Sequence, residues 1–178
     1  MRNENLIFVD IETTGTNPDK HEIIELAYIL VKQDGGKFTV IEEREFKIKP
    51  EHIENAEPVA LRINGYDPSQ WIFASSLSEV MKVFSDKSSG AVFVAQNVTF
   101  DYSFIERAMT KCNVPNEMFY AKLDTISMAY AKLYKDPRAE KFSLYRLAEY
   151  FGITNVKSHT AMADTRTTFE VFKRLMSL

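Results

Sequence analysis

The sequence of 178 residues contains a single cysteine, Cys112, which excludes an internal disulfide and favours a reducing compartment. It contains only six glycines and six prolines, and no linker-like or low-complexity segment is visible. It has no apolar run as long as a membrane span, and its first residues, MRNEN, lack the apolar core of a signal peptide. These absences predict a cytoplasmic protein without a membrane segment.

The sequence also lacks an excess of positive charge. Its 22 basic residues are balanced by 25 acidic residues, which gives a net charge of −3. This balance argues against a protein held on nucleic acid by bulk positive charge. It does not argue against an enzyme that meets phosphate groups through bound metal ions, because such ions supply positive charge locally.

Hydrophobic residues make up 45% of the chain, enough for the full core of one domain over residues 1–178. The first half has the composition and periodicity of strands, and the irregular stretch 51–72 predicts a short helix followed by a loop. Strands are expected at Leu6–Glu12, Glu22–Lys32, Lys37–Lys49 and Ala91–Ala95, with a short one at Tyr120–Leu123.

The remaining apolar residues recur at helical spacing. Ser143 is expected to cap one of these helices and Gly152 to end it. Helices are expected at Leu77–Ser85, Phe100–Lys111, Thr125–Tyr134, after Ser143 as far as Phe151, and along a stripe from Ala161 to Met176. Strands followed by interleaved strands and helices predict an α/β fold, a mixed sheet covered by helices.

The first unusual stretch is FVDIETTG, residues 8–15, where a buried strand ends in Asp10 and Glu12. Side chains alternate along a strand, so both carboxylates point to the same side and Ile11 points to the other. Two neighbouring carboxylates repel each other unless a cation lies between them. The pair therefore indicates either a solvated strand end or a site for a divalent metal.

Two further stretches place polar groups against the predicted core. The strand Ala91–Ala95 runs through QNVTF into Asp101 in the first turn of a helix, where an acidic residue can also serve the helix dipole. Near the C-terminus, His159 stands five residues before Asp164, which lies at the border of the apolar stripe of the last helix. Taken singly, His159 could be a capping residue and Asp164 could pair with a nearby basic residue.

Taken together, these four carboxylates and one imidazole could converge on the carboxyl edge of one sheet. Oxygen ligands without cysteine suit Mg²⁺ or Mn²⁺ rather than structural zinc. Several carboxylates in a small site need about two divalent cations, and pairs of such ions serve phosphoryl displacement, with a histidine as general base. The combination predicts hydrolysis of phosphodiester bonds.

The sequence resembles the DnaQ-like 3′–5′ exonucleases of the DEDDh class, which have an RNase H-like fold with helices on both faces of a mixed sheet. The first motif of that family matches DIETTG (residues 10–15), the second matches NVTFD (residues 97–101), and the third matches His159 with Asp164. The sister class has a tyrosine four residues before the last aspartate, where this chain has Thr160. The match covers nearly the whole chain. Within this family, the sequence is similar to the epsilon proofreading subunit of bacterial DNA polymerase III.

The resemblance implies a role for each matched residue. Asp10 would contact both metal ions, Glu12 and Asp164 would hold the ion that carries the attacking water, and Asp101 would support the second ion. His159 would act as the general base. The product would be a nucleoside 5′-monophosphate released from the 3′ end of a single strand, with DNA expected more than RNA.

The resemblance also implies substrate contacts, from Thr13 and Thr14 to the terminal nucleotide, from Phe100 to its base or sugar, and from Ile63 and Asn64 along the loop that lines the nucleoside. The family often has histidine where this chain has Asn64, and also where it has Gln96 just before the second motif.

Three functions remain open from the sequence. The first is a proofreading exonuclease that works with a DNA polymerase, and the second is a stand-alone exonuclease that trims RNA or single-stranded DNA. The chain stops soon after its last predicted helix, without the tethering tail of family proofreading subunits, which favours a stand-alone enzyme or a shortened chain. The third is a protein without catalytic activity, which is either a nucleic-acid-binding module on the same fold or a structural or interaction domain whose carboxylates are merely solvated.

Overall fold

A five-stranded sheet forms the centre of the computed structural model, which describes residues 3–154 and 160–178. The strand order is β3-β2-β1-β4-β5. The first three strands form an antiparallel meander, and β4 and β5 extend it in parallel from β1. The strands are β1 (Leu6–Thr13), β2 (Ile23–Asp34), β3 (Lys37–Lys47), β4 (Val92–Ala95) and β5 (Lys122–Asp124).

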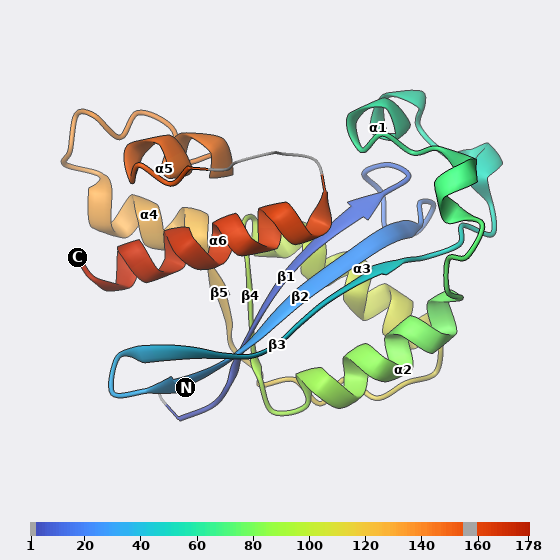
Figure 1. Ribbon diagram of the computed structural model, residues 1–178, viewed down its shortest axis with the longest axis horizontal. Helices are drawn as coiled ribbons and strands as arrows, with labels where there is room; N and C mark the ends of the chain where they lie inside the picture. The colour runs from blue at the N-terminus through green and yellow to red at the C-terminus, as the bar shows by residue number, and fades with distance from the viewer. Residues whose placement is uncertain (1–2, 155–159) are drawn as a thin grey trace.

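Helices cover both faces of this sheet (Figure 1). Two helices, α2 and α3, pack on one face, and α6 packs across β1, β2 and β3 on the other, with α4 and α5 against it. A short helix, α1, lies between two 3-10 turns, Ile53–Asn55 and Pro68–Trp71. The helices are α1 (Pro58–Ile63), α2 (Leu77–Ser88), α3 (Val98–Lys111), α4 (Thr125–Leu133), α5 (Leu144–Tyr150) and α6 (Ala161–Met176).

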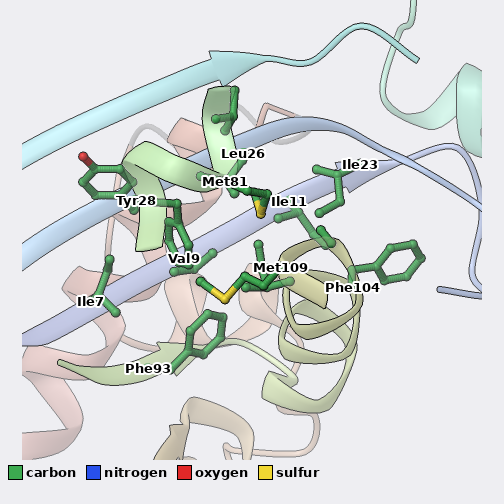
Figure 2. Packing of buried hydrophobic residues seen from close by; sticks show 14 of the residues in the cluster. Ile7, Val9, Ile11, Ile23, Leu26, Tyr28, Met81, Phe93, Phe104 and Met109 are labelled. Carbon is green, nitrogen blue, oxygen red and sulfur yellow. The ribbon is translucent and has the colours of Figure 1, made fainter. Parts of the chain in front are cut away.

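The alternation of side chains along β1 divides the core into two layers. Ile7, Val9 and Ile11 belong to the cluster that includes residues of α2 and α3, shown in Figure 2. Leu6 and Phe8 belong to the opposite cluster, where the Phe8 ring lies 4.9 Å from Phe169 of α6 and 5.0 Å from Phe172. Burying one such side chain stabilises the fold by roughly 1.5–3 kcal/mol. Asp10 and Glu12 continue the second set and therefore face α6.

The predicted α/β fold, a mixed sheet with helices on both faces, is confirmed. Most differences lie at element ends: for example, β5 begins at Lys122 rather than Tyr120, α3 begins at Val98 rather than Phe100, and β3 ends at Lys47. In the stretch 51–72, 3-10 turns at Ile53–Asn55 and Pro68–Trp71 flank the predicted short helix, where only a loop was expected after it. Ser143 precedes α5 as predicted, but its side chain makes no capping hydrogen bond. A serine before a helix indicates where the helix begins and does not by itself determine the hydroxyl's partner.

Within residues 3–154 and 160–178, no helix is both long enough and apolar enough to cross a membrane.

Candidate metal centre

Asp10 and Glu12 lie near the carboxyl end of β1, on the face that α6 covers. In the antiparallel register, Asp10 pairs with Ala27 and Glu12 pairs with Glu25 of β2. Ala27 is fully buried and packs with Ala161 and Met162 at the start of α6. The small side chain of Ala27 lets the helix approach the sheet closely beside Asp10.

The start of α6 brings a third carboxylate to this pair. Thr160 caps the helix through a hydrogen bond of 3.3 Å that its Oγ1 accepts from the Ala163 amide. Asp164 follows in the first turn and faces the sheet. One oxygen each from Asp10, Glu12 and Asp164 lies within 4.8 Å of the others. Residues separated by more than 150 positions, near the two ends of the sequence, thus meet in one cluster.

Asp101 approaches the same cluster from the other side, in the first turn of α3, and is 3% exposed. The chain enters this helix directly from β4 through Asn97, whose φ of 63° lies in the left-handed region that asparagine tolerates better than most residues. The Asn97 amide donates to Asp124 Oδ1 at 3.1 Å, and the Ile126 amide donates to the same oxygen at 2.9 Å. Asp124 therefore links the starts of α3 and α4 at the carboxyl edge of the sheet.

The electrostatics of the cluster disfavour ionised carboxylates. Burial raises the pKa of Asp10 well above its ordinary value, and the charges of Asp101, Asp164, Glu12 and Glu25 raise it further. Burial, with the charges of Glu25 and Asp164, raises the pKa of Glu12 to about 7. Burial also raises the pKa of Asp101 to about 8, although hydrogen bonds from its own backbone and that of Ile11 oppose the shift.

This donor set fits divalent cations. The three clustered side chains offer only hard oxygen atoms, which Mg²⁺ and Mn²⁺ prefer over sulfur or imidazole donors. The mutual repulsion that raises the pKa of Asp10 is removed when cations lie between the carboxylates. The predicted Mg²⁺ or Mn²⁺ cofactors therefore match both the chemistry and the arrangement of these side chains.

The structure brings together Asp10, Glu12 and Asp164, and the charge of Asp101 acts on Asp10. His159, predicted to be the general base, lies outside the described residues. The next residue, Thr160, is described and caps α6 as noted above, so the segment that contains His159 leads directly into the helix that carries Asp164.

The loop after β1 uses the polar groups of Thr13 and Thr14 internally. The Thr13 hydroxyl donates to the Gly15 carbonyl at 2.7 Å, and the Thr14 hydroxyl accepts from the Glu22 amide at 2.8 Å. Asn64 is 9% exposed, and its side-chain amide donates to the Thr13 carbonyl at 3.0 Å. These contacts hold the end of α1 against this loop, beside the carboxylate cluster.

The two apolar residues predicted to contact substrate lie in different surroundings. Ile63 at the end of α1 is 55% exposed and free to meet another molecule. Phe100 in the first turn of α3 is partly buried against the core, with its ring 5.1 Å from that of Phe104.

Gln96, which directly follows β4, donates to the Phe142 carbonyl at 2.7 Å and accepts from the Thr125 hydroxyl at 2.6 Å.

Sequence reasoning missed Glu25, which is 6% exposed and lies directly opposite Glu12 on the face that α6 covers. Its charge raises the pKa of both Asp10 and Glu12. One signal was present in the sequence, because Glu25 interrupts the apolar run IIELAYILV. The register that places it beside Glu12 depends on strand pairing and could not be read from the run alone.

The sequence of this chain matches the family model described as Exonuclease over residues 7–172. Ribonuclease T of Shewanella sp. (strain ANA-3) is 27% identical over 184 residues, which cover 96% of this chain and 81% of that protein. Ribonuclease T of Shewanella oneidensis is 27% identical over 179 residues, which cover 93% of this chain and 79% of that protein. None of these relatives is described as a polymerase subunit.

Solved structures of Exonuclease I have the same fold. The E. coli enzyme in complex with a dT13 oligonucleotide superposes with a TM-score of 0.80 at 22% identity, over 97% of this chain and 41% of that one. A moderately thermophilic Exonuclease I from Methylocaldum szegediense superposes with a TM-score of 0.83 at 20% identity, over 98% of this chain and 40% of that one. The chain therefore spans about two fifths of the length of these solved proteins.

Proposed function

Because the chain belongs to the Exonuclease family, we propose that it is a stand-alone nuclease that trims the 3′ end of single-stranded RNA or DNA. The observation that carries this proposal is the cluster of Asp10, Glu12 and Asp164, with carboxylate oxygens within 4.8 Å of one another. The cluster differs from an ordinary acidic surface, because Asp10 and Glu12 are only partly exposed and lie on the face of the sheet that α6 covers.

Each residue has a proposed role. Asp10, Glu12 and Asp164 would hold the divalent cations, and Asp101 would support them from the start of α3. His159 would take the proton from the attacking water, a role worth roughly 10²–10⁴ in rate. When bound, divalent cations supply Lewis acidity, which makes water a better nucleophile near neutral pH and stabilises charge on the departing oxygen. The product is a nucleoside 5′-monophosphate.

The loop after β1 and the end of α1 form the proposed site for the terminal nucleotide. Hydrogen bonds within the loop occupy the side chains of Thr13 and Asn64, so we assign them to holding the loop in shape. Thr14 is 1% exposed and its hydroxyl oxygen accepts from the Glu22 amide, so we assign its side chain to the shape of the loop as well. Exposed Ile63 and partly buried Phe100 are the proposed apolar contacts to the nucleoside.

The relatives support trimming rather than proofreading. Ribonuclease T is named for action on RNA, and Exonuclease I has been solved with DNA oligonucleotides. A polymerase partner receives no support from either group of proteins. The two groups of proteins support either RNA or DNA as the substrate of this chain. Experiment must therefore assign the natural substrate.

A panel of matched DNA and RNA oligonucleotides, labelled at the 5′ end and incubated with Mg²⁺ or Mn²⁺, tests this function. We expect a ladder that shortens from the 3′ end and is abolished by a chelator. Asp10→Asn should lower the rate at least ~100-fold, because the cations it holds contribute several kcal/mol to transition-state stabilisation.

The matched control for this substitution is Asp34→Asn, which removes a carboxylate from the exposed hairpin end of β2. It should leave the rate within a few-fold of the parent. Hydrolysis by Asp10→Asn at a rate similar to the parent would contradict the proposed function. The relative rates on RNA and DNA then identify the substrate.

A further inference from the structure

The first turn of α6 is fastened by three side chains, two of which come from the sheet. The Ala161 amide donates to Glu25 Oε2 at 3.4 Å, and the Met162 amide donates to Glu45 Oε1 at 3.4 Å. The third bond is the cap of Ala163 by Thr160 described above. The first amides of a helix have no partner within the helix and attract negative charge. Here β2 and β3 supply that charge from beneath the helix.

Glu25 is the buried member of this arrangement. One of its oxygens accepts from Ala161, and the other lies 3.9 Å from Nζ of Lys47, its neighbour across the β2–β3 pair. The Lys47 ammonium group itself lies 3.9 Å from the centre of the Trp71 ring. A carboxylate is costly to bury unless each oxygen has a partner, and Glu25 has one for each.

This fastening acts on the metal centre because Asp164 is in the same turn of helix as Ala161. The Asp164 amide bonds to the Thr160 carbonyl at 3.2 Å, so the carboxylate follows any shift in the start of the helix. Asp10 and Glu12 repel Asp164 when no cation is present. The hydrogen bond to Glu25, together with the contact of Ala161 and Met162 with Ala27, opposes that repulsion.

We propose that Glu25 is a positioning residue. By accepting the hydrogen bond of Ala161, it fixes the first turn of α6 on the sheet and thereby holds Asp164 within reach of Asp10 and Glu12. The inference rests on the proposed metal centre but not on the identity of the nucleic-acid substrate. Its test therefore measures metal binding rather than hydrolysis.

Three substitutions distinguish the effect of the hydrogen bond from Ala161 from the effect of the negative charge of Glu25. Glu25→Gln keeps the reach and an acceptor oxygen but loses the charge. Glu25→Asp keeps the charge but is one methylene too short to reach Ala161. Glu25→Met has neither, and its apolar chain of similar length suits the buried site, so it tests the proposal even if the aspartate variant does not fold.

Calorimetric titration with Mn²⁺ is the measurement, with thermal denaturation in chelator to compare the folds. We expect Glu25→Asp and Glu25→Met to weaken Mn²⁺ binding about 10–100-fold, the usual range for residues that orient metal ligands. Glu25→Gln should stay within a few-fold of the parent. Glu43→Gln is the control, because Glu43 joins β3 to Arg166 of α6 at 2.7 Å on the exposed side of the helix and should have no effect on Mn²⁺ affinity.

Two results overturn this inference while leaving the metal centre intact. In one, all three Glu25 variants bind Mn²⁺ like the parent. In the other, Glu25→Asp binds like the parent and Glu25→Gln binds weakly, which would show that only the charge matters. A parent protein that binds no Mn²⁺ overturns the metal centre and this inference together, so the two failures are distinguishable.

Discussion

Asp10 shows at the scale of one residue how a functional group is kept where it is unfavourable. Its carboxyl group is surrounded by other carboxyl groups on β1, β2, α3 and α6. In the metal-free protein this arrangement favours protonation, whereas a bound cation requires ionised ligands. Proton and metal therefore compete for the same oxygens.

The competition predicts how stability depends on pH. The pKa values of Glu12 and Asp101 are raised to about 7 and about 8. At these two groups the folded protein keeps protons that the unfolded chain has already released, so their contribution to the unfolding free energy is greatest at acidic pH and is lost as pH rises through these values. Thermal denaturation in chelator should show a melting temperature that decreases between about pH 5 and about pH 8.

Asp101→Asn is the matched variant for this experiment, because it removes one of the two groups whose pKa values are raised into this range. Its melting temperature should depend less steeply on pH. With saturating Mn²⁺ the slope of the parent should flatten or reverse, since metal binding becomes stronger as the ligands lose their protons. A parent melting temperature that rises with pH in chelator would contradict the raised pKa values of these buried carboxyl groups.

The clustering of Asp10, Glu12 and Asp164 was predictable from the sequence, but the hydrogen bonds of the neighbouring side chains were not. Asp10, Glu12 and Asp164 interrupt apolar patterns at predicted element ends, and three of those signals combine into one family pattern. The resemblance implied contacts from Thr13 to the terminal nucleotide, and the structure adds a hydrogen bond from its hydroxyl to the Gly15 carbonyl. Local hydrogen bonds of this kind depend on loop geometry that residue spacing does not contain.

At the scale of elements, the loop between β1 and β2 depends on the absence of a side chain at Gly15. A Cβ atom built on this glycine would lie 2.5 Å from two atoms of the His21 ring, well inside contact distance. The ring is held there because its Nδ1 accepts from the Asn17 amide at 2.9 Å. The loop that carries Thr13 and Thr14 is therefore shaped around this histidine.

Gly15→Ala should destabilise the protein by about 1–3 kcal/mol, the usual cost of forcing extra volume into a packed site. Urea denaturation measures this change. In a His21→Ala background the cost of Gly15→Ala should be smaller by at least ~0.5 kcal/mol, because the colliding ring is gone and residues in contact are not additive. Equal costs in the two backgrounds would show that the collision with His21 is not the cause.

Helices and strands were predictable where the hydrophobic periodicity of their own residues defines them. They were less predictable where pairing between strands sets their bounds or register. The strands β1 and β2 and the helices α2 and α6 follow from runs and stripes that the sequence displays. β5 is only three residues long and is defined by its partners on β4, so its bounds were displaced in the prediction. The register that sets Glu25 opposite Glu12 likewise comes from pairing between strands.

At the scale of the whole molecule, the candidate metal centre brings together β1 and α6, so a bound ion would connect segments far apart in the chain. An ion that binds only the folded protein adds stability by mass action, about 2.7 kcal/mol at a concentration 100 times its dissociation constant. For a protein of this length, that corresponds to a rise of about 5–10 °C in melting temperature.

We therefore expect Mn²⁺ to raise the melting temperature of the parent by this amount at neutral pH, measured by calorimetry or by dye-monitored thermal shift. Asp164→Asn, which removes the ligand from α6, should lose most of the rise. The exposed Asp34→Asn should retain it. An unchanged melting temperature in the parent at millimolar Mn²⁺ would favour the alternative in which the carboxylates are merely solvated.

The division of the ligands between the first strand and the last helix has a consequence for synthesis. A nascent chain on the ribosome exposes Asp10 and Glu12 long before Asp164 is made, and α6 can pack on the sheet only after residues 161–176 have emerged. The growing polypeptide therefore carries an incomplete set of clustered carboxylates until α6 docks on the sheet. Cations that bind the complete cluster can stabilise the chain only after this last step of folding.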